Sequence, residues 1–220
     1  MTYASDFEAK EMICEYGRRL YARGFVAGNE GNISCRVGEN EIYVTPTMES
    51  KGFLNPDMLV KMDLDGNIIG GIYKQSSETK MHIGLYRQDP SIGAVIHAHP
   101  TTATAFACRK QPLDASYLPE SAILFRMAVP VTEFAIPSTE AVPNSVIPYA
   151  KTHRALLLGN HGALTWGEGL KDTWFLMETL EQYCKIYLAM QQIGDCEPLP
   201  EEMQAMFAGY LQQMMQGSSS

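Results

Sequence analysis

Apolar residues near the start of the chain recur at intervals of three or four, which is the spacing of one face of an amphipathic helix. This face contains Ala9, Met12, Ile13, Tyr16 and Leu20. Ser5 and Glu8 fit a capping box, in which each side chain bonds the other residue's backbone N–H. The pattern predicts a helix that begins after Ser5 and ends near Gly24.

Short apolar runs separated by turn residues follow this helix and predict strands. Residues 33–37 and 41–45 flank a glycine-containing turn at 38–40, as expected for a hairpin. Residues 59–64 form another run, which ends at an Asp-Gly turn. This part of the chain is therefore expected to begin a sheet.

The rest of the chain alternates between helical and extended patterns. Helical spacing predicts helices over 76–86, 101–108, 170–191 and 201–216. Apolar runs predict buried strands over 92–99, 155–158 and 163–166. Residues 111–148 combine prolines with short apolar pieces and predict no clear element. Strands interleaved with helices indicate an α/β fold, and the hairpin-length connections indicate that part of its sheet is antiparallel.

Length and composition are those of one globular domain with a sizeable core. Hydrophobic residues make up 45% of the 220 positions and charged residues 19%, and no linker or repeat marks an internal boundary. We therefore expect a single domain over 1–216. The glycine- and serine-containing residues 217–220 are expected to be a flexible tail or an artificial extension.

Charge, hydropathy and cysteine usage narrow the class of protein. A net charge of -8 argues against a nucleic-acid binder, which needs a basic surface, but it permits a locally built anion site. No apolar stretch reaches membrane-spanning length, and the first residues lack the basic start and apolar core of a signal peptide. The five cysteines are scattered without a C-x-x-C pair. We expect a cytoplasmic protein with reduced thiols and with neither nucleic-acid nor membrane partners.

His97 and His99 stand two residues apart at the end of a predicted strand. Because strand side chains alternate between faces, both imidazoles are expected to point the same way. In one interpretation they supply half of a tetrahedral metal site. In the other they are polar residues that cap a strand beside a turn.

His161 offers a third imidazole at the end of a second predicted strand, between Gly159 and Gly162. A third histidine that reaches the first two completes three nitrogen ligands and leaves one position open. That is the pattern of a catalytic zinc ion, whereas structural zinc sites are closed. The alternative is an ordinary turn histidine.

Glu78 follows two serines at the predicted start of a helix. The N-terminus of a helix favours negative charge, and neighbouring hydroxyls add donors for an anion. Asn32 and Thr47 lie in separate turns and are candidates to bind the same anion, although such residues also fill turns for local reasons. His82 lies one helical turn after Glu78, so it either supports this site or packs in the core.

Five short motifs, taken in order, resemble those of the class II aldolase/adducin family. They are G-N-I-S (31–34), T-P-T (45–47), S-S-E (76–78), H-A-H (97–99) and N-H-G (160–162). The resemblance covers residues 28–166. It implies a three-layer α/β/α fold with a mostly antiparallel mixed sheet, assembled as a homotetramer with active sites at subunit interfaces.

The resemblance also implies roles for individual residues. Zn²⁺, or another divalent ion such as Mn²⁺ or Co²⁺, would be held by His97, His99 and His161. Glu78 would be the catalytic acid or base. The substrate phosphate would be bound by Asn32, Thr47, Ser76 and Ser77. Two catalytic tyrosines of the family would correspond to Tyr117 and Tyr210, whose spacing aligns less cleanly.

The implied activity is cleavage of a ketose 1-phosphate, either L-fuculose 1-phosphate or a close analogue, to dihydroxyacetone phosphate and a small aldehyde. Alternatives within the family are a 3-oxo-tetronate 4-phosphate decarboxylase, a ribulose-phosphate 4-epimerase and a methylthioribulose-phosphate dehydratase. The epimerases typically have Asp where Glu78 stands. A remote alternative is a non-catalytic interaction module such as that of adducin, against which the three histidines argue.

The predicted phosphate loop departs from the family pattern at one position. Met48 follows Thr47 where the aldolases commonly have glycine, so a glycine N–H with free dihedral angles is absent there. Lys51, further along the same loop, is a candidate source of positive charge.

Overall fold

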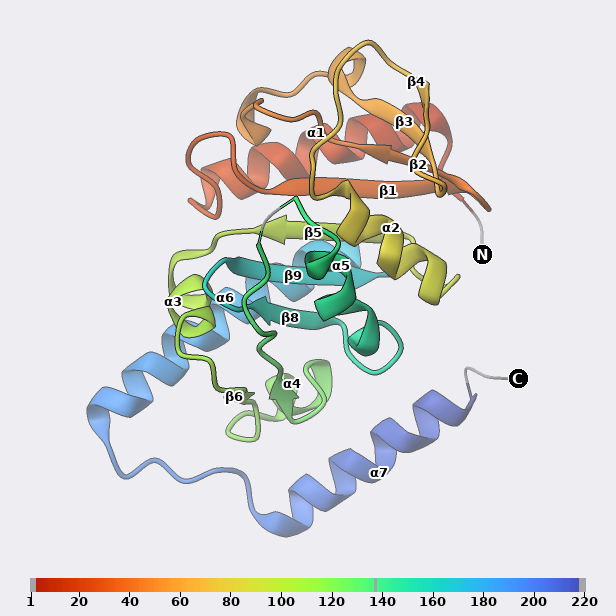
Figure 1. Ribbon diagram of the computed structural model, residues 1–220. Coiled ribbons are helices and arrows are strands. Elements are labelled where there is room, and N and C mark those ends of the chain that lie inside the picture. The colour runs from red at the N-terminus through yellow and green to blue at the C-terminus, as the bar shows by residue number, and fades with distance from the viewer. Residues whose placement is uncertain (1–2, 137, 218–220) are drawn as a thin grey trace.

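A computed structural model describes residues 3–136 and 138–217, with side chains described as far as Tyr210. One seven-stranded sheet forms the centre of this part of the chain (Figure 1). In spatial order its strands are β4 (Ile68–Gly70), β3 (Val60–Asp63), β2 (Glu41–Val44), β1 (Asn32–Gly38), β5 (Ala94–Ala98), β9 (Gly162–Gly167) and β8 (Ala155–Leu158). Each neighbouring pair of these strands runs antiparallel.

The register of the central strands brings distant parts of the sequence together. Asn32 of β1 lies opposite His97 of β5, and Ala98 of β5 lies opposite Ala163 of β9. Residues that are opposite in an antiparallel pair project from the same face of the sheet. Asn32 and His97 are therefore neighbours on one face, although they lie 65 positions apart in the sequence.

Helices cover both faces of the sheet. One face is covered by α1 (Asp6–Ala22), α3 (Thr101–Ala107) and α6 (Leu170–Ile193), and the other by α2 (Thr79–Gln88) and α5 (Ala141–Val146). Each side has its own cluster of buried apolar side chains. This three-layer α/β/α arrangement around an antiparallel sheet confirms the predicted fold.

The longest helix shows how the predicted pattern becomes packing. Trp174, Met177 and Leu180 of α6, which the sequence places on one apolar stripe, are all buried against the sheet. Burying a large apolar side chain contributes roughly 1.5–3 kcal/mol. This stripe therefore holds α6 beneath β5 and β9, the strands that lead to the candidate metal ligands.

Most predicted elements are present, with a few differences. The capping box at Ser5 is formed, and α1 begins at Asp6. The helix predicted from residue 76 begins instead at Thr79, because Glu78 is its N-cap and the two serines lie in the preceding loop. β4 was not predicted, because it has only three residues, and its two isoleucines are exposed and not part of a buried apolar run.

The region that gave no clear prediction contains short elements. They are β6 (Leu113–Asp114), α4 (Pro119–Leu124), β7 (Ala128–Val129) and α5, followed by the 3-10 helix η3 (Ile147–Tyr149). The two strands have two residues each, too few for an apolar run, and the two helices have six each, too few for a helical period to become visible. Two other 3-10 helices, η1 (Lys51–Phe53) and η2 (Pro56–Met58), lie between β2 and β3.

The last helix, α7 (Glu201–Gly217), stands away from the central sheet (Figure 1). It contacts α4, and Leu199 before it donates a hydrogen bond to the Ser116 carbonyl. The tail predicted for 217–220 begins at the last residue of this helix, and 218–220 lie outside the described residues. Most described side chains of α7 are exposed or half-buried.

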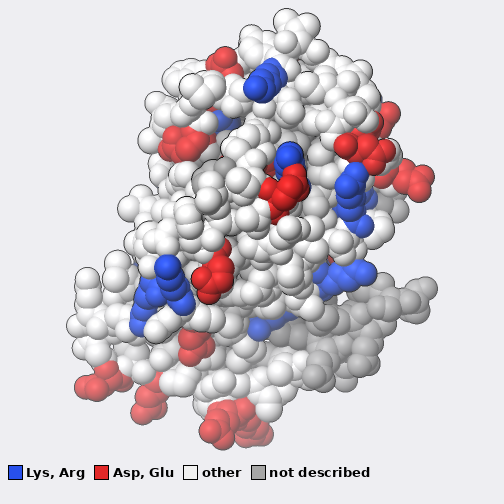
Figure 2. All heavy atoms as spheres, in the orientation of Figure 1, with Lys and Arg blue, Asp and Glu red and all other residues white. Residues whose placement is uncertain are grey.

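Basic and acidic side chains are interspersed on the face shown in Figure 2, and no continuous basic surface crosses it. Several opposite charges on the surface pair directly, such as Lys80 with Glu140 and Arg87 with Asp65. Among the described helices, none is both long enough and apolar enough to cross a membrane.

Candidate active site

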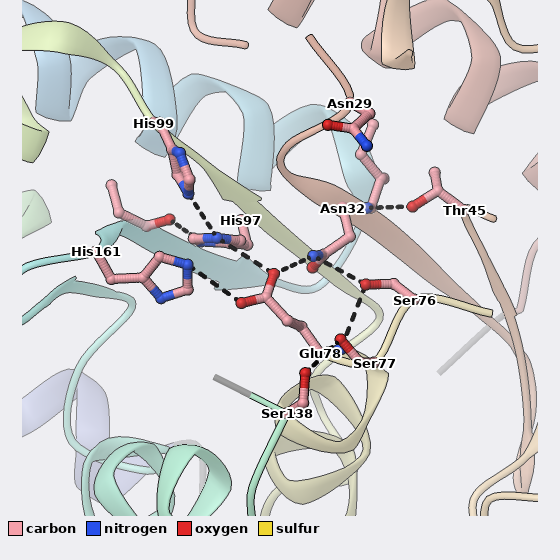
Figure 3. Close-up of polar contacts among 12 residues, drawn as sticks. Asn29, Asn32, Thr45, Ser76, Ser77, Glu78, His97, His99, Ser138 and His161 are labelled. Atoms are coloured by element: carbon pink, nitrogen blue, oxygen red, sulfur yellow. Dashed lines mark hydrogen bonds and ion pairs between the residues drawn. The ribbon is translucent and has the colours of Figure 1, made fainter. Parts of the chain in front are cut away.

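Three imidazoles converge at one end of the central strands. His97 is on β5, His99 follows it immediately, and His161 lies in the turn between β8 and β9 (Figure 3). Because β5 and β9 are antiparallel neighbours, the end of β5 lies beside the start of β9, where this turn is. One ligand atom from each residue lies within 4.8 Å of the others. The structure thus brings together the three histidines that the sequence singled out.

The packing of the imidazoles depends on a residue without a side chain. A Cβ at Gly162 would lie 2.5 Å from His99 Cδ2 and 3.1 Å from His97 Cε1, and it would also meet the Ala98 carbonyl oxygen at 2.7 Å. Any larger residue would displace both rings. The adjacent Asn160 has a φ of 55°, a left-handed conformation that asparagine tolerates better than most residues. The N-H-G motif therefore turns the chain tightly and leaves room for the histidine cluster.

The chemistry of this cluster fits a divalent metal. His97 Nδ1 lies 2.9 Å from the Ala163 carbonyl oxygen, which makes Nδ1 the protonated nitrogen and leaves Nε2 free as a ligand. Burial lowers the pKa of all three imidazoles, to about 4 for His99. Neutral imidazole is the form that binds metals, so the three histidines are in the metal-binding protonation state at neutral pH. Three protein nitrogens match the ligand count of a catalytic zinc site, in which water or substrate takes the fourth position.

Glu78 lies directly beside the imidazoles. Its carboxylate oxygens are 3.2 Å from His161 Nε2 and 3.5 Å from His97 Nε2, and the side chain is 14% exposed. Burial raises the pKa of Glu78, but the two imidazoles and a hydrogen bond from Asn32 outweigh that effect and lower it below its ordinary value. Glu78 is therefore ionised at neutral pH and able to accept a proton.

Asn32 is bonded to Glu78, a contact that the sequence did not reveal. Its Nδ2 donates to Glu78 Oε2 at 2.7 Å and lies 3.5 Å from Ser76 Oγ. Its Oδ1 is buried and has no hydrogen-bond partner among the described residues. An unpaired buried acceptor is costly, and a substrate hydroxyl or a water molecule would satisfy it. Asn32 thus both orients Glu78 and offers an acceptor to a ligand.

The residues predicted to bind a phosphate meet around a cavity of about 160 Å³. Its lining includes Asn32, Thr47, Ser76, Ser77 and Glu78. The volume is well below the roughly 300–1,000 Å³ of sites for drug-sized ligands, so it suits one small group. Since Glu78 and Asn32 border both the cavity and the histidines, the two parts form one continuous site.

Backbone pairing holds the two loops of this cavity together. Thr47 N–H donates to the Lys74 carbonyl at 2.9 Å, and Pro46 bridges to Gln75. The T-P-T loop is therefore fixed beside the serines that follow residue 75. Another hydroxyl arrives from the loop before α5, because Ser138 Oγ donates to Ser77 Oγ at 2.9 Å. No local sequence pattern identified Ser138, which is 61 residues from its partner.

Met48 keeps the backbone conformation that glycine usually supplies. Its φ is 62°, in the left-handed region, and its side chain is mostly exposed. The loss of glycine from the loop therefore leaves the left-handed backbone in place, at the cost of strain in a residue that carries a Cβ.

The two predicted tyrosines are not brought to the histidines within one chain. The Tyr117 ring packs against Tyr187 with centroids 5.8 Å apart, and Tyr210 is 51% exposed on α7. Figure 1 shows α7 well away from the end of β5. Their catalytic roles remain predictions that require another subunit or a movement of α7.

His82 takes part in a buried polar network on the face of the sheet covered by α2. Its Nδ1 lies 2.7 Å from Ser34 Oγ, which is also 2.7 Å from the Tyr86 hydroxyl. Burial lowers the pKa of His82 to about 3, so this imidazole is neutral. The interpretation of His82 as a support for the site is consistent with this position, one helical turn below Glu78.

Two buried or half-buried charges near the site escaped the sequence analysis. Glu30 borders the cavity and accepts hydrogen bonds from the N–H groups of Ala27 and Gly28. Glu181 on α6 is buried and accepts from Thr102 and Ala103 N–H, which caps the helix that follows His99. Charged residues on helices and loops are common, and only the fold shows that these are enclosed.

Comparisons with known proteins agree with this geometry. The family profile described as "Class II Aldolase and Adducin N-terminal domain" matches residues 11–188. The chain is 33% identical over 195 residues to a 3-oxo-tetronate 4-phosphate decarboxylase from Haemophilus influenzae, covering 85% of this chain and 90% of that protein. It is 33% identical over 176 residues to an L-fuculose phosphate aldolase from Methanococcus maripaludis, covering 80% and 93%. A solved structure of an L-fuculose 1-phosphate aldolase has a TM-score of 0.86 at 30% identity, covering 96% of this chain and 99% of the other.

Proposed function

The chain belongs to the class II aldolase/adducin family, and we propose that it is a zinc-dependent aldolase acting on a ketose 1-phosphate. L-fuculose 1-phosphate or a close analogue would be cleaved to dihydroxyacetone phosphate and a small aldehyde. One observation carries the proposal: Glu78 stands between three converging imidazoles and a small cavity lined by hydroxyl and amide groups. This arrangement suits a substrate that has a reacting hydroxy-ketone and a phosphate close together.

A divalent ion held by His97, His99 and His161 would supply a Lewis acid that polarises the oxygens of the hydroxy-ketone. Ser76, Ser77 and Thr47 would bind the phosphate and fix the substrate's position. The buried Oδ1 of Asn32 would accept a hydrogen bond from a substrate hydroxyl, while its Nδ2 keeps Glu78 oriented.

Proton transfer at carbon is the proposed task of Glu78. In cleavage, the C4 hydroxyl loses its proton, the C3–C4 bond breaks to release the aldehyde, and the electron pair remains as an enediolate. Glu78 then delivers a proton to C3, which completes dihydroxyacetone phosphate. In the reverse direction, the ionised Glu78 removes this proton, a role consistent with its lowered pKa. Tyr117 and Tyr210 are proposed as the residues that accept the proton of the C4 hydroxyl in cleavage.

Decarboxylation of 3-oxo-tetronate 4-phosphate is the second candidate, favoured by the 33% identity to the decarboxylase over 85% of the chain. That substrate would lose its carboxylate as carbon dioxide and leave the same enediolate. The same protonation by Glu78 would then give the same dihydroxyacetone phosphate. The two candidates differ only in the group that leaves, so both use the cavity and Glu78 in the same way.

Product analysis separates these reactions. The zinc-loaded protein would be incubated with ketose 1-phosphates, with 3-oxo-tetronate 4-phosphate and with the unphosphorylated sugars. Dihydroxyacetone phosphate with an aldehyde supports the aldolase, and dihydroxyacetone phosphate with carbon dioxide supports the decarboxylase. Equal turnover of phosphorylated and unphosphorylated substrates would remove the phosphate assignment of the cavity. A C4 epimer as the product would overturn both candidates.

A further inference from the structure

Lys51 is a buried cation on the wall of the cavity that contains Ser76 and Ser77. The residue is 1% exposed, which is unusual for lysine. Its Nζ donates hydrogen bonds to the backbone carbonyls of Asn29, at 2.7 Å, and Glu49. An ammonium group has three N–H donors, so one of the three remains for another partner.

The positive charge of Lys51 has no direct counter-ion in the described part of the chain. No carboxylate oxygen of a described residue lies within the 4.0 Å of an ion pair, and the facing carboxylates of Glu30, Glu49 and Glu78 act only at longer range. Two of these carboxylates already bind other groups: Glu30 accepts from backbone N–H groups, and Glu78 from Asn32. Burial lowers the pKa of Lys51 to about 8, which reflects the cost of an ammonium that is not neutralised.

The other polar groups of the cavity are neutral donors or carboxylates. Thr47, Ser76 and Ser77 present hydroxyls, and Asn32 presents an amide. These groups hydrogen-bond an oxyanion but do not balance its charge. Lys51 is the cation among the residues that line this cavity, so it is the group that would distinguish a dianion from a neutral ligand of the same shape.

We propose that Lys51 is a specificity-determining residue, whose free N–H binds the phosphate of the substrate and whose charge selects for a dianion. This inference rests on the proposed function, since it assigns the cavity to a sugar phosphate. It applies to both candidate reactions, because both substrates carry a phosphate on the same side of the ketone. The charge of the incoming phosphate would supply the counter-ion that the free protein lacks.

The position of Lys51 in the loop supports a role in binding. It is the first residue of η1, four residues after Thr47, and its hydrogen bond to the Asn29 carbonyl ties this loop to the one that contains Asn29. Asn29 and Thr47 both border the cavity, so Lys51 connects two of its walls. A ligand that binds the third N–H would therefore contact a group that is already held in place, which reduces the entropy lost on binding.

The test is titration of the zinc-loaded protein with inorganic phosphate at pH 7.5, followed by calorimetry. Lys51→Met keeps the length and apolar stem of the side chain and is expected to weaken phosphate binding about 10- to 100-fold, the range for loss of a charge-assisted hydrogen bond. Lys171→Met removes the same charge from an exposed position on α6 and is expected to bind as the wild type does. Phosphate affinity of Lys51→Met within about threefold of the wild type, or no phosphate binding by the wild type, would overturn the inference.

A second measurement needs no variant and covers the case in which Lys51→Met does not fold. Sulfate stays a dianion throughout the range, and the carboxylates that face Lys51 are those of Glu30, Glu49 and Glu78. The pKa of Lys51, about 8 because of burial, lies within the range, so this ammonium loses its charge there. Sulfate affinity of the wild type is expected to fall at least tenfold between pH 7.5 and 9.5, as Lys51 loses its proton. A flat profile would contradict the inference.

Two further results separate this inference from the proposed reaction. Acetate, titrated in parallel, is expected to bind the wild type and Lys51→Met equally weakly. If the substitution weakened the binding of acetate alone, Lys51 would not select for a dianion, and the inference would be overturned. Wild-type protein that binds phosphate through Lys51 but turns over no sugar phosphate would reject the proposed reaction and leave the anion site standing.

Discussion

Glu78 contacts His97 and His161 through its carboxylate and receives a hydrogen bond from Asn32. Each contact comes from a different segment of the chain, so the position of this carboxylate is determined by the fold as a whole. At the scale of single residues, the site therefore consists of a carboxylate held between three converging imidazoles and a small cavity, for which we propose roles in proton transfer, metal binding and anion binding.

Removal of one imidazole is expected to abolish zinc binding. His97→Ala, His99→Ala and His161→Ala each leave two nitrogen ligands, too few for the three-ligand pattern of catalytic zinc. Zinc per chain, measured by mass spectrometry after dialysis, should fall from about one to near zero. His153→Ala, which changes a half-buried histidine that packs against Tyr149, should retain full zinc. Full occupancy in any of the first three variants would remove that residue from the ligand set.

Glycine at position 48 is expected to stabilise the protein. Met48 has a φ of 62°, which costs a residue with a Cβ roughly 1–2 kcal/mol, and glycine avoids this cost while losing some entropy on folding. Met48→Gly should therefore raise the free energy of unfolding in urea by up to about 1 kcal/mol. Glu49→Gly is the matched control at a neighbouring position without positive φ, and it should lower stability. A loss of stability in Met48→Gly equal to that in Glu49→Gly would show that position 48 is unstrained.

The sequence predicted which residues meet, but not what surrounds them. The alternation of a strand was enough to place His97 and His99 on one side, and the motifs named Glu78 and the serines. The bond between Asn32 and Glu78 joins residues 46 positions apart, and the burial of Lys51 depends on carbonyls from two loops. No local period encodes such contacts. For the same reason, Tyr117 and Tyr210 stay predictions.

At the scale of elements, α2 is attached to β1 by polar side chains rather than by apolar packing alone. Three alternate residues of β1 face the helix, namely Asn32, Ser34 and Arg36. Three residues spaced one helical turn apart face the strand, namely Glu78, His82 and Tyr86. Arg36 Nη2 donates to the Tyr86 carbonyl at 2.8 Å. The periods of strand and helix thus match along this contact, which fixes the end of α2 that carries Glu78.

Ser34 is the residue on which this network depends most. Ser34→Ala leaves both the His82 Nδ1 and the Tyr86 hydroxyl buried without their partner, whereas Tyr86→Phe removes one hydroxyl and leaves Ser34 bonded to His82. We expect Ser34→Ala to cost about 2–4 kcal/mol of unfolding free energy and Tyr86→Phe about 1 kcal/mol. Ser50→Ala is the control, because the buried Ser50 hydroxyl has no partner among the described residues, so its removal breaks no hydrogen bond and should not lower stability. A smaller effect for Ser34→Ala than for Tyr86→Phe would contradict the network.

The long helices were predictable from apolar spacing, and most strands of the central sheet from apolar runs bounded by turn residues, whereas the short elements of the 111–148 region were not. The stripe of α6 and the capping box of α1 were visible because several local signals agreed. The helices and strands between Leu113 and Val146 have two to six residues each and depend on their neighbours for order. The start of α2 was placed three residues early, because the two serines resemble the residues of a helix start.

At the scale of the whole molecule, we propose that four chains assemble, as the family resemblance implies. Several large apolar side chains are exposed, namely Phe7, Phe53, Ile72, Ile136 and Ile193, and Ile72 is 92% exposed. The separated position of α7 also leaves Tyr210 free to approach another subunit. Light scattering should give about 98 kDa, the mass of four chains of 24.4 kDa. A mass near 24 kDa at working concentration would contradict the tetramer and require another explanation for α7.

The central claim is that Glu78 transfers a proton to and from carbon in a three-carbon phosphate fragment shared by both candidate reactions. It is tested most directly without any aldehyde or carbon dioxide, by incubating dihydroxyacetone phosphate with zinc-loaded protein in D₂O. Proton NMR would follow the exchange of one hydrogen on the hydroxymethyl carbon. We expect the wild type to catalyse this exchange and Glu78→Gln to be slower by about 10²- to 10⁴-fold, the usual contribution of a general acid–base group. The variant should retain its zinc, because the three imidazoles are intact. Exchange at the wild-type rate in zinc-loaded Glu78→Gln, or no exchange by the wild type, would contradict the account.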